Sequence, residues 1–128
     1  MTIECPFCAR LATGEPFLRN ELGAVITDAF PVSPSHLLVI PTRHEPDFFG
    51  LSAAEQHALV DLVARARAWL DEHHHPAGYN VGINVGETGG QTVGHAHIHV
   101  IPRFAGDVDD PRGGVRWVLP ARAAYWRP

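Results

Sequence analysis

Hydrophobic residues in the first third of the chain form short runs of strand length. Residues 22–28 (LGAVITD) predict a strand because Val25 and Ile26 favour extended backbone. Residues 36–40 (HLLVI) form a denser apolar run that Pro41 stops. Since this second run does not alternate with polar residues, we expect a central strand that is covered on both faces.

A helical pattern fills residues 52–73. Ser52 and Glu55 have the spacing of a capping box, in which each side chain satisfies a free backbone amide of the first turn. Apolar residues then recur every three or four positions, as expected for one face of a helix. This stripe consists of Leu59, Leu62, Val63, Ala66 and Leu70. We expect the helix to serve as scaffold for the sheet.

Two further strands are predicted in the second half of the chain. Residues 79–85 (YNVGINV) alternate, residues 86–90 form a Gly-rich connection, and residues 92–101 (TVGHAHIHVI) predict a strand ended by Pro102. The first sixteen residues are rich in turns, and the tail shows no clear period. Strands joined by short turns around one helix indicate an α+β domain with a mainly antiparallel sheet.

Composition narrows the class of protein. With 128 residues and 45% hydrophobic residues, the chain fits one globular domain. Its net charge is −4 and all its basic side chains are Arg, which makes it a poor partner for nucleic acid. No apolar run approaches the roughly 18 residues that cross a bilayer, and Met1–Cys5 does not resemble a secretion signal. We therefore expect a cytoplasmic protein without a membrane or nucleic-acid partner.

Three of the nine histidines alternate along the last predicted strand. Successive side chains of a strand point to opposite faces, so His95, His97 and His99 share one face while Ala96 and Ile98 face the core. This spacing suits two chemistries. Histidines two apart can bind one zinc, although the outer pair would be about 13 Å apart without a bend. Alternatively, the central imidazole, largely neutral at cytosolic pH, attacks an electrophile between two partners.

The wider sequence favours the nucleophile by resemblance. Residues 95–101 (HAHIHVI) match the His-x-His-x-His-x-x signature, with x apolar, of the histidine-triad (HIT) superfamily. Residues 35–41 (SHLLVIP) with His44, the loop 84–92 (NVGETGGQT) and Pro102-Arg103 are similar to other family segments in the same order. The chain thus resembles bacterial HIT-family nucleotide hydrolases.

This resemblance implies the fold and the assembly. Family members have the HIT fold, a mainly antiparallel five-stranded sheet with one long and one short helix per protomer, and commonly form homodimers. We expect a HIT domain at residues 1–104 and a tail at residues 105–128, which packs on the same domain or on the dimer partner.

The resemblance also implies a reaction. Relatives cleave dinucleoside polyphosphates or nucleoside 5'-phosphoramidates at the α-phosphate, through a covalent nucleotidyl-histidine and without a cofactor in the chemistry. Carried onto this chain, His97 is the nucleophile, His99 contacts the phosphate or leaving group, and His36 supports the site. Two alternatives stay open: a non-catalytic nucleotide-binding regulatory protein, and a metalloenzyme that uses the alternating histidines as ligands.

Substrate contacts follow from the same alignment of motifs. The family carboxylate that binds the ribose hydroxyls matches Asp28, and apolar side chains favour a purine, with adenosine expected. Without the resemblance, each of the residues assigned here to substrate contacts would be interpreted as a turn cap, a loop residue or part of the core. The expected base contacts are Phe7 and Ile26, and the expected phosphate contacts are Asn84, Gln91 and Thr92.

Some bacterial relatives hold a structural zinc, which would explain a short Cys-x-x-Cys motif. The ligands would map onto Cys5, Cys8, His44 and His95, a closed set with no position open for chemistry. The alternative is a pair of free thiols in a reducing compartment, with His44 at the surface.

Overall fold

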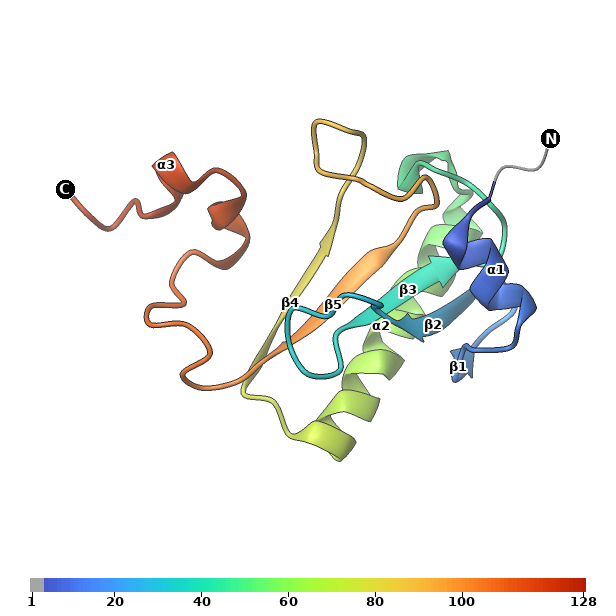
Figure 1. Cartoon of the computed structure of the whole chain (residues 1–128), viewed down its shortest axis with the longest axis horizontal. Helices are drawn as coiled ribbons and strands as arrows, with labels where there is room; N and C mark the ends of the chain where they lie inside the picture. Colours follow the sequence, from blue (N-terminus) through green and yellow to red (C-terminus); the bar gives the residue numbers. More distant parts are fainter. Residues whose placement is uncertain (1–3) are drawn as a thin grey trace.

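The computed structural model of the protein describes residues 4–128, so Met1–Ile3 lie outside it, including most of the start inspected for a secretion signal. Five antiparallel strands form one sheet in the order β1-β2-β3-β5-β4 (Figure 1). This confirms the expected α+β class and antiparallel sheet. The strands are β1 (Leu18–Arg19), β2 (Gly23–Thr27), β3 (Leu37–Pro41), β4 (Gly78–Ile83) and β5 (Ile98–Arg103).

One long and one short helix accompany the sheet, as the family resemblance implied. The long helix is α2 (Ala53–His74) and the short one is α1 (Pro6–Ala12). The residue pattern alone predicted only turns for α1, which begins with Pro6 in its first turn and has the thiol of Cys5 accepting the Cys8 N–H. Short helical segments complete the chain: η1 (Phe48–Gly50), η2 (Gly114–Val118) and α3 (Pro120–Ala123).

Helix α2 covers one face of the sheet. Its capping box is present as predicted, with Ser52 Oγ accepting the Glu55 N–H and the Glu55 carboxylate accepting the Ser52 N–H. The stripe packs as expected, since Leu59, Leu62, Ala66 and Leu70 are fully buried. Gly23 permits this close approach, because a Cβ there would lie 2.6 Å from Leu59. No helix within residues 4–128 has the length and apolar character needed to cross a membrane.

Strand β3 is buried on both faces, which explains its unbroken apolar run. Leu37 and Val39 belong to the cluster under α2, whereas Leu38 and Ile40 pack beneath α1 on the opposite face. The prediction of a central strand is confirmed, since β3 pairs with both β2 and β5.

Strand β5 is shorter at its start and longer at its end than predicted. It begins at Ile98 rather than at residue 92, because the Ala96 N–H donates to the Glu45 carbonyl at 2.7 Å instead of joining the ladder. It continues through Pro102, which was expected to end it. Pro102 lies beyond the β3 ladder, where β5 pairs only with β4, so a residue without an N–H is tolerated.

Candidate active site and metal centre

Histidines gather at the end of the sheet face that carries α1. Ala96 and Ile98 pack in the α2 cluster, so the predicted division between an apolar face and a histidine face holds even though residues 95–97 precede the strand. The rings of His97 and His99 lie 5.0 Å apart, and Phe7 of α1 makes edge contacts with the rings of His95 and His97.

His97 is held in one tautomer by the main chain. Its Nδ1 lies 2.8 Å from the carbonyl oxygen of His95. Because a carbonyl can only accept, Nδ1 carries the proton and the neutral ring has its lone pair on Nε2. The side chain is only 6% exposed, and the Phe7 ring packs edge-on against it. The arrangement leaves an unprotonated ring nitrogen whose lone pair points in a defined direction.

His36 and His99 form a hydrogen-bonded pair beside His97. The Val32 N–H donates to His36 Nδ1 at 3.2 Å, so the proton of a neutral His36 is on Nε2. That nitrogen lies 3.0 Å from His99 Nδ1, which accepts from it. A neutral His99 therefore keeps its own proton on Nε2, and the pair presents a hydrogen-bond donor rather than a base.

Asp28 borders this pair. Its Oδ2 lies 3.4 Å from His36 Nε2 and 3.9 Å from His99 Nδ1, while its Oδ1 accepts the Phe30 N–H. Burial nevertheless outweighs the carboxylate: it lowers the pKa of His36, and together with the neighbouring His97 and His36 it lowers the pKa of His99 to about 4. Both rings are therefore neutral near pH 7.

The other predicted substrate contacts are dispersed. Asn84 lines a cavity together with His36 and His99. Gln91 is engaged within the loops: its Oε1 accepts the Gly86 N–H, and its Nε2 donates to the carbonyls of Pro46 and Val93.

The two expected base contacts lie in the core in this structure, and Thr92 lies at the surface. The side chains of Phe7 and Ile26 are 7% and 1% exposed and belong to the apolar cluster beneath α1. Thr92, in contrast, is exposed to solvent.

The predicted zinc ligands come together from three distant segments. The sulfur and Nδ1 atoms of Cys5, Cys8, His44 and His95 all lie within 4.8 Å of one another. A tetrahedral zinc would separate two nitrogens by roughly 3.3 Å and a nitrogen from a sulfur by roughly 3.6 Å. The two Nδ1 atoms lie 3.2 Å apart, and the thiol of each cysteine lies 3.4 Å from an imidazole nitrogen.

The chemistry of the donors also fits zinc. His95 is fully buried, and its Nε2 donates to the Pro41 carbonyl at 2.9 Å, which leaves the lone pair on Nδ1 aimed at the thiols. A second group, Asp28, His36 and His99, also has its ligand atoms close enough together to hold an ion. There, however, the Val32 N–H occupies one nitrogen of His36 and the other carries the proton, so the neutral ring offers no free lone pair.

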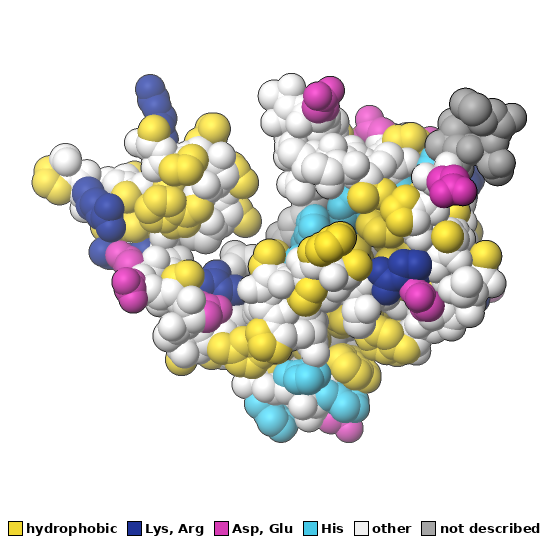
Figure 2. Space-filling model, in the orientation of Figure 1, with side chains coloured by type: hydrophobic (Ala, Val, Ile, Leu, Met, Phe, Trp, Pro, Cys, Tyr) yellow, Lys and Arg dark blue, Asp and Glu magenta, His cyan; other side chains and the backbone are white. Residues whose placement is uncertain are grey.

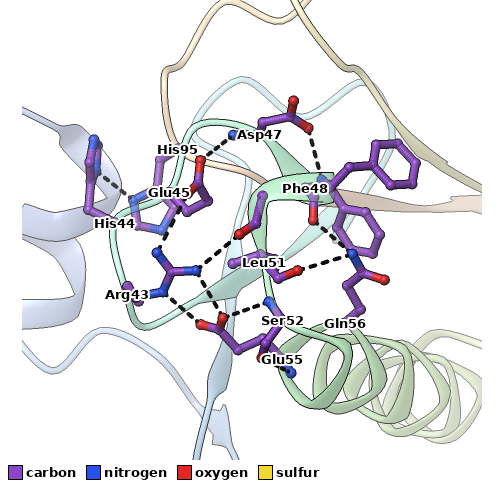
Figure 3. A network of polar contacts seen from close by, with 12 residues as sticks. Arg43, His44, Glu45, Asp47, Phe48, Leu51, Ser52, Glu55, Gln56 and His95 are labelled. Atoms are coloured by element: carbon purple, nitrogen blue, oxygen red, sulfur yellow. Dashed lines mark hydrogen bonds and ion pairs between the residues drawn. The ribbon is translucent and has the colours of Figure 1, made fainter.

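The loop that carries His44 is anchored on the start of α2 (Figure 3). Arg43 pairs with the Glu55 carboxylate through two contacts of 2.9 and 3.0 Å, and Glu55 is also the capping-box residue. These contacts lower the pKa of Glu55 to about 2. The helix terminus thereby fixes the position from which His44 reaches the cluster.

Sequence reasoning missed one part of the surroundings of His36 and His99. Together with Asn84 they line a cavity of about 430 Å³, whose opposite wall comes from the tail residues Val115, Trp117 and Val118. The tail carries no periodic pattern, so the sequence held no signal for this placement.

Comparison with known proteins agrees with these features. The HIT domain family matches residues 12–106. The chain is 33% identical over 92 residues to an AP-4-A phosphorylase of Mycobacterium tuberculosis, covering 71% of this chain and 47% of that one. It is 34% identical over 94 residues to an asymmetrical bis(5'-nucleosyl)-tetraphosphatase of Schizosaccharomyces pombe, covering 73% and 52%. The chain thus spans about half the length of these two relatives.

Solved structures are similar in fold as well. A HIT family protein from Bacillus anthracis matches with a TM-score of 0.76 and 29% identity, covering 84% of this chain and 78% of that one. A Zn-bound histidine triad family protein from Mycobacterium smegmatis matches with a TM-score of 0.75 and 31% identity, covering 81% and 78%. With the histidine geometry and the family match over most of its length, the chain belongs to the HIT domain family.

Proposed function

We propose that the protein is a nucleotide hydrolase that cleaves at the α-phosphate through a covalent nucleotidyl-His97 intermediate. The observation that carries this proposal is the bond from His97 Nδ1 to the His95 carbonyl, which leaves Nε2 free to attack. The relatives from Mycobacterium tuberculosis and Schizosaccharomyces pombe, by name a phosphorylase and a tetraphosphatase, support the same class of substrate.

The reaction proceeds in two displacements. In the first, the Nε2 lone pair of His97 forms a bond to the α-phosphorus as the bond to the leaving group breaks, and the His95 carbonyl stabilises the resulting cationic ring. In the second, water attacks phosphorus, the N–P bond breaks, and the electron pair returns to Nε2. One proton is released to solvent, and the nucleoside monophosphate leaves.

The state of His99 favours a phosphoanhydride substrate over a phosphoramidate. With its pKa lowered to about 4, His99 is a neutral donor whose Nε2–H stabilises charge but does not readily give up a proton. A terminal phosphate, with a second pKa near 6, leaves without protonation. An amine with a pKa of about 10 needs a proton in order to leave. The pairing of His36 with His99 therefore suits dinucleoside polyphosphates better.

Trapping the intermediate tests the function. Mixing the enzyme with diadenosine tetraphosphate labelled in the adenosines, followed by an alkaline quench within milliseconds, should leave labelled adenylate on the peptide that contains His97. A guanosine analogue run in parallel tests the expected preference for adenosine. If no nucleotide gives an adduct while binding is intact, a binding protein without catalysis replaces this proposal.

We further propose that Cys5, Cys8, His44 and His95 hold one structural zinc, which would cross-link α1 to the sheet and supply no step of the reaction. The donor geometry and the Zn-bound relative from Mycobacterium smegmatis support this. Metal analysis of protein purified without chelators tests it. We place the protein in the cytoplasm, where Cys5 and Cys8 would remain reduced.

We also propose a homodimer formed along β4. This strand is the last of the sheet, so its outer edge has no partner strand within residues 4–128, and its Val81 is exposed. An unpaired edge that carries an apolar side chain is suited to pairing with another chain. Sedimentation of the full chain tests this, and a monomer at micromolar concentration contradicts it.

A further inference from the structure

The loop between β2 and β3 carries an exposed aromatic side chain beside the proposed active site. Phe30 is 88% exposed, and it lies two residues after Asp28 and six before His36. The loop lies over the sheet face that carries α1 (Figure 1). On this face, Figure 2 shows histidine side chains next to hydrophobic ones. The position of this ring, rather than its exposure alone, makes it informative.

Hydrogen bonds give this loop a defined shape. The Asp28 N–H donates to the His36 carbonyl, and the His36 N–H donates to the Ser33 carbonyl. The Val32 N–H donates to His36 Nδ1 at 3.2 Å. Ser33 Oγ donates to the Pro102 carbonyl of β5 at 2.8 Å. The loop is therefore held in place relative to the histidine pair.

The two oxygens of the Asp28 carboxylate point to different parts of the site. Oδ2 lies 3.4 Å from His36 Nε2 and 3.9 Å from His99 Nδ1. Oδ1 accepts the Phe30 N–H at 2.8 Å. Each oxygen has a further lone pair, so both can still accept a hydroxyl. One edge of the carboxylate thus faces the histidines, and the other faces Phe30.

The shape of a nucleotide matches this order of groups. In a nucleoside 5'-phosphate, the base is attached beside the 2'-hydroxyl, and the phosphate branches off beyond the 3'-hydroxyl. If Asp28 binds these two hydroxyls and the phosphate lies at His97, the base extends past the opposite edge of the carboxylate. Consecutive Cα atoms lie about 3.8 Å apart, so the Phe30 side chain starts within about 7.6 Å of the Asp28 Cα. The ring is therefore within reach of the base.

The residues that the family resemblance assigned to the base do not offer it a surface. Phe7 and Ile26 are 7% and 1% exposed in the apolar cluster beneath α1. The Phe7 ring makes edge contacts with the rings of His95 and His97 instead. An exposed aromatic ring can stack on the face of any nucleobase. Phe30 thus supplies the surface that these two buried side chains lack.

We infer that Phe30 is a specificity-determining residue that stacks on the base of the bound nucleotide. The inference rests on the proposed function, because the base reaches this ring when Asp28 holds the ribose and His97 faces the phosphate. Phe30 lines neither of the two cavities that Val32 shares with Asn80 of β4, so it is not part of the wall that borders the proposed dimer edge. The ring would add affinity for the base and leave the reaction at phosphorus unchanged.

A second exposed phenylalanine provides a matched control. Phe49 is 71% exposed in η1, where its ring packs edge-on against Phe48. For Phe30→Ala and Phe49→Ala, we would measure by calorimetry the Kd of AMP and of ribose 5-phosphate, which lacks the base. We would also measure KM and kcat for diadenosine tetraphosphate.

The inference predicts an effect that depends on the base. Phe30→Ala should raise Kd for AMP about tenfold, the size of one lost base-stacking contact, and leave Kd for ribose 5-phosphate unchanged. KM for diadenosine tetraphosphate should rise by a similar factor at constant kcat, because the lost contact is equally strong in the ground state and the transition state. Phe49→Ala should change none of these.

A tryptophan at the same position gives a signal that a purely structural role would not produce. Phe30→Trp keeps a stacking surface, so AMP should quench the added emission and ribose 5-phosphate should not. In Phe49→Trp, neither ligand should change the added emission.

Equal losses of AMP and ribose 5-phosphate binding in Phe30→Ala would assign the ring to the shape of the loop and overturn the inference. An unchanged Kd for AMP, or equal effects of the two alanine variants, also overturns it, and turnover by the wild type would then leave the proposed function standing. If Phe30→Ala loses binding only for AMP but the wild-type protein turns over no nucleotide, the proposed function fails and the stacking contact stands.

Discussion

Two histidine clusters lie side by side on one face of the sheet, and hydrogen bonding gives them different chemistry. In the cluster with Cys5 and Cys8, the protonated nitrogen of His95 faces a carbonyl and its lone pair faces the thiols. In the pair His36–His99, a backbone N–H occupies the lone pair of His36, so that ring donates to His99. The tautomer set by the surrounding main chain, rather than the residue type, separates the proposed metal ligand His95 from the proposed reaction partner His99.

Replacing the proposed nucleophile, His97, should give the largest functional effect. His97→Ala removes the attacking nitrogen, so turnover of diadenosine tetraphosphate should fall by at least about 10³-fold. Zinc content and Tm should stay near those of the wild type, because His97 is not part of the thiol cluster. Steady-state kinetics with metal analysis measures both, and a variant that keeps its activity contradicts the division of roles.

A substitution in the proposed zinc site should lower the stability of the protein and leave its catalytic rate nearly unchanged. Cys8→Ser removes one of the proposed zinc ligands. We expect bound zinc to be lost and the free energy of unfolding to fall by about 2–3 kcal/mol, or roughly 10 °C in Tm. The kcat of the folded protein at low temperature should remain within about threefold of the wild type, since Cys8 lies outside the reacting groups. Unchanged Tm with full zinc loss would show that the metal does not hold α1.

Protonation of His99 should make the stability of the folded protein depend on pH. The pKa of His99 is about 4 in the folded protein and about 6.5 unfolded, so between these values the unfolded chain binds more protons. Stability is therefore full above about pH 6.5 and decreases as the pH falls toward 4, by roughly 1–3 kcal/mol. Denaturant titrations from pH 7 to pH 4.5 measure this.

His99→Asn is the control for that titration, since it keeps a hydrogen-bonding side chain without an ionisable ring. Its stability should vary less with pH over the same range. An equally steep loss in the variant would assign the effect to other groups.

A smaller effect is expected from the residues that support the proposed zinc site. Arg43→Gln removes the charge that ties the His44 loop to Glu55, so zinc should dissociate to a chelator about tenfold more readily. Turnover should not change. Arg67→Gln, which removes an exposed ion pair with Asp71 elsewhere on α2, is the matched control.

The smallest effect concerns the approach to His36. Ser35 has a φ of +65°, a left-handed conformation that glycine adopts more easily, and its hydroxyl lies 2.8 Å from His74 Nε2. Ser35→Gly should therefore change the free energy of unfolding by less than about 1 kcal/mol, because relieved strain offsets the lost exposed hydrogen bond. A large loss of activity would show that the His74 contact positions His36.

Local patterns predicted the scaffold well and the loops poorly. The capping box and stripe of α2 and the dense run of β3 are set by neighbouring residues, so their positions could be derived from the sequence. The segment before β5 was wrongly predicted as strand because the bond from Ala96 to Glu45 joins residues that only the folded chain brings together.

The sites divide in the same way. Alternation placed the three histidines on a common face, but Cys5 and His95 are separated by 90 positions, and only family resemblance linked them. The family resemblance predicted a tail at residues 105–128. It did not predict that Val115 and Val118 line the cavity of His36 and His99, because that placement depends on contacts between residues far apart in the sequence. The sequence pattern alone therefore predicted the parts of the site that depend on neighbouring residues, and it did not predict contacts between distant segments.

Position 95 acts through two separate parts. The ring of His95 faces the thiols, while its backbone oxygen accepts from Nδ1 of His97, the proposed nucleophile. Any amino acid at position 95 would supply that oxygen. Side-chain substitutions would therefore test only the contact of the ring with the thiols, and an alignment of homologues would not report on the contact of the carbonyl with His97. A backbone carbonyl oxygen can therefore be required for the proposed reaction although no side-chain substitution removes it.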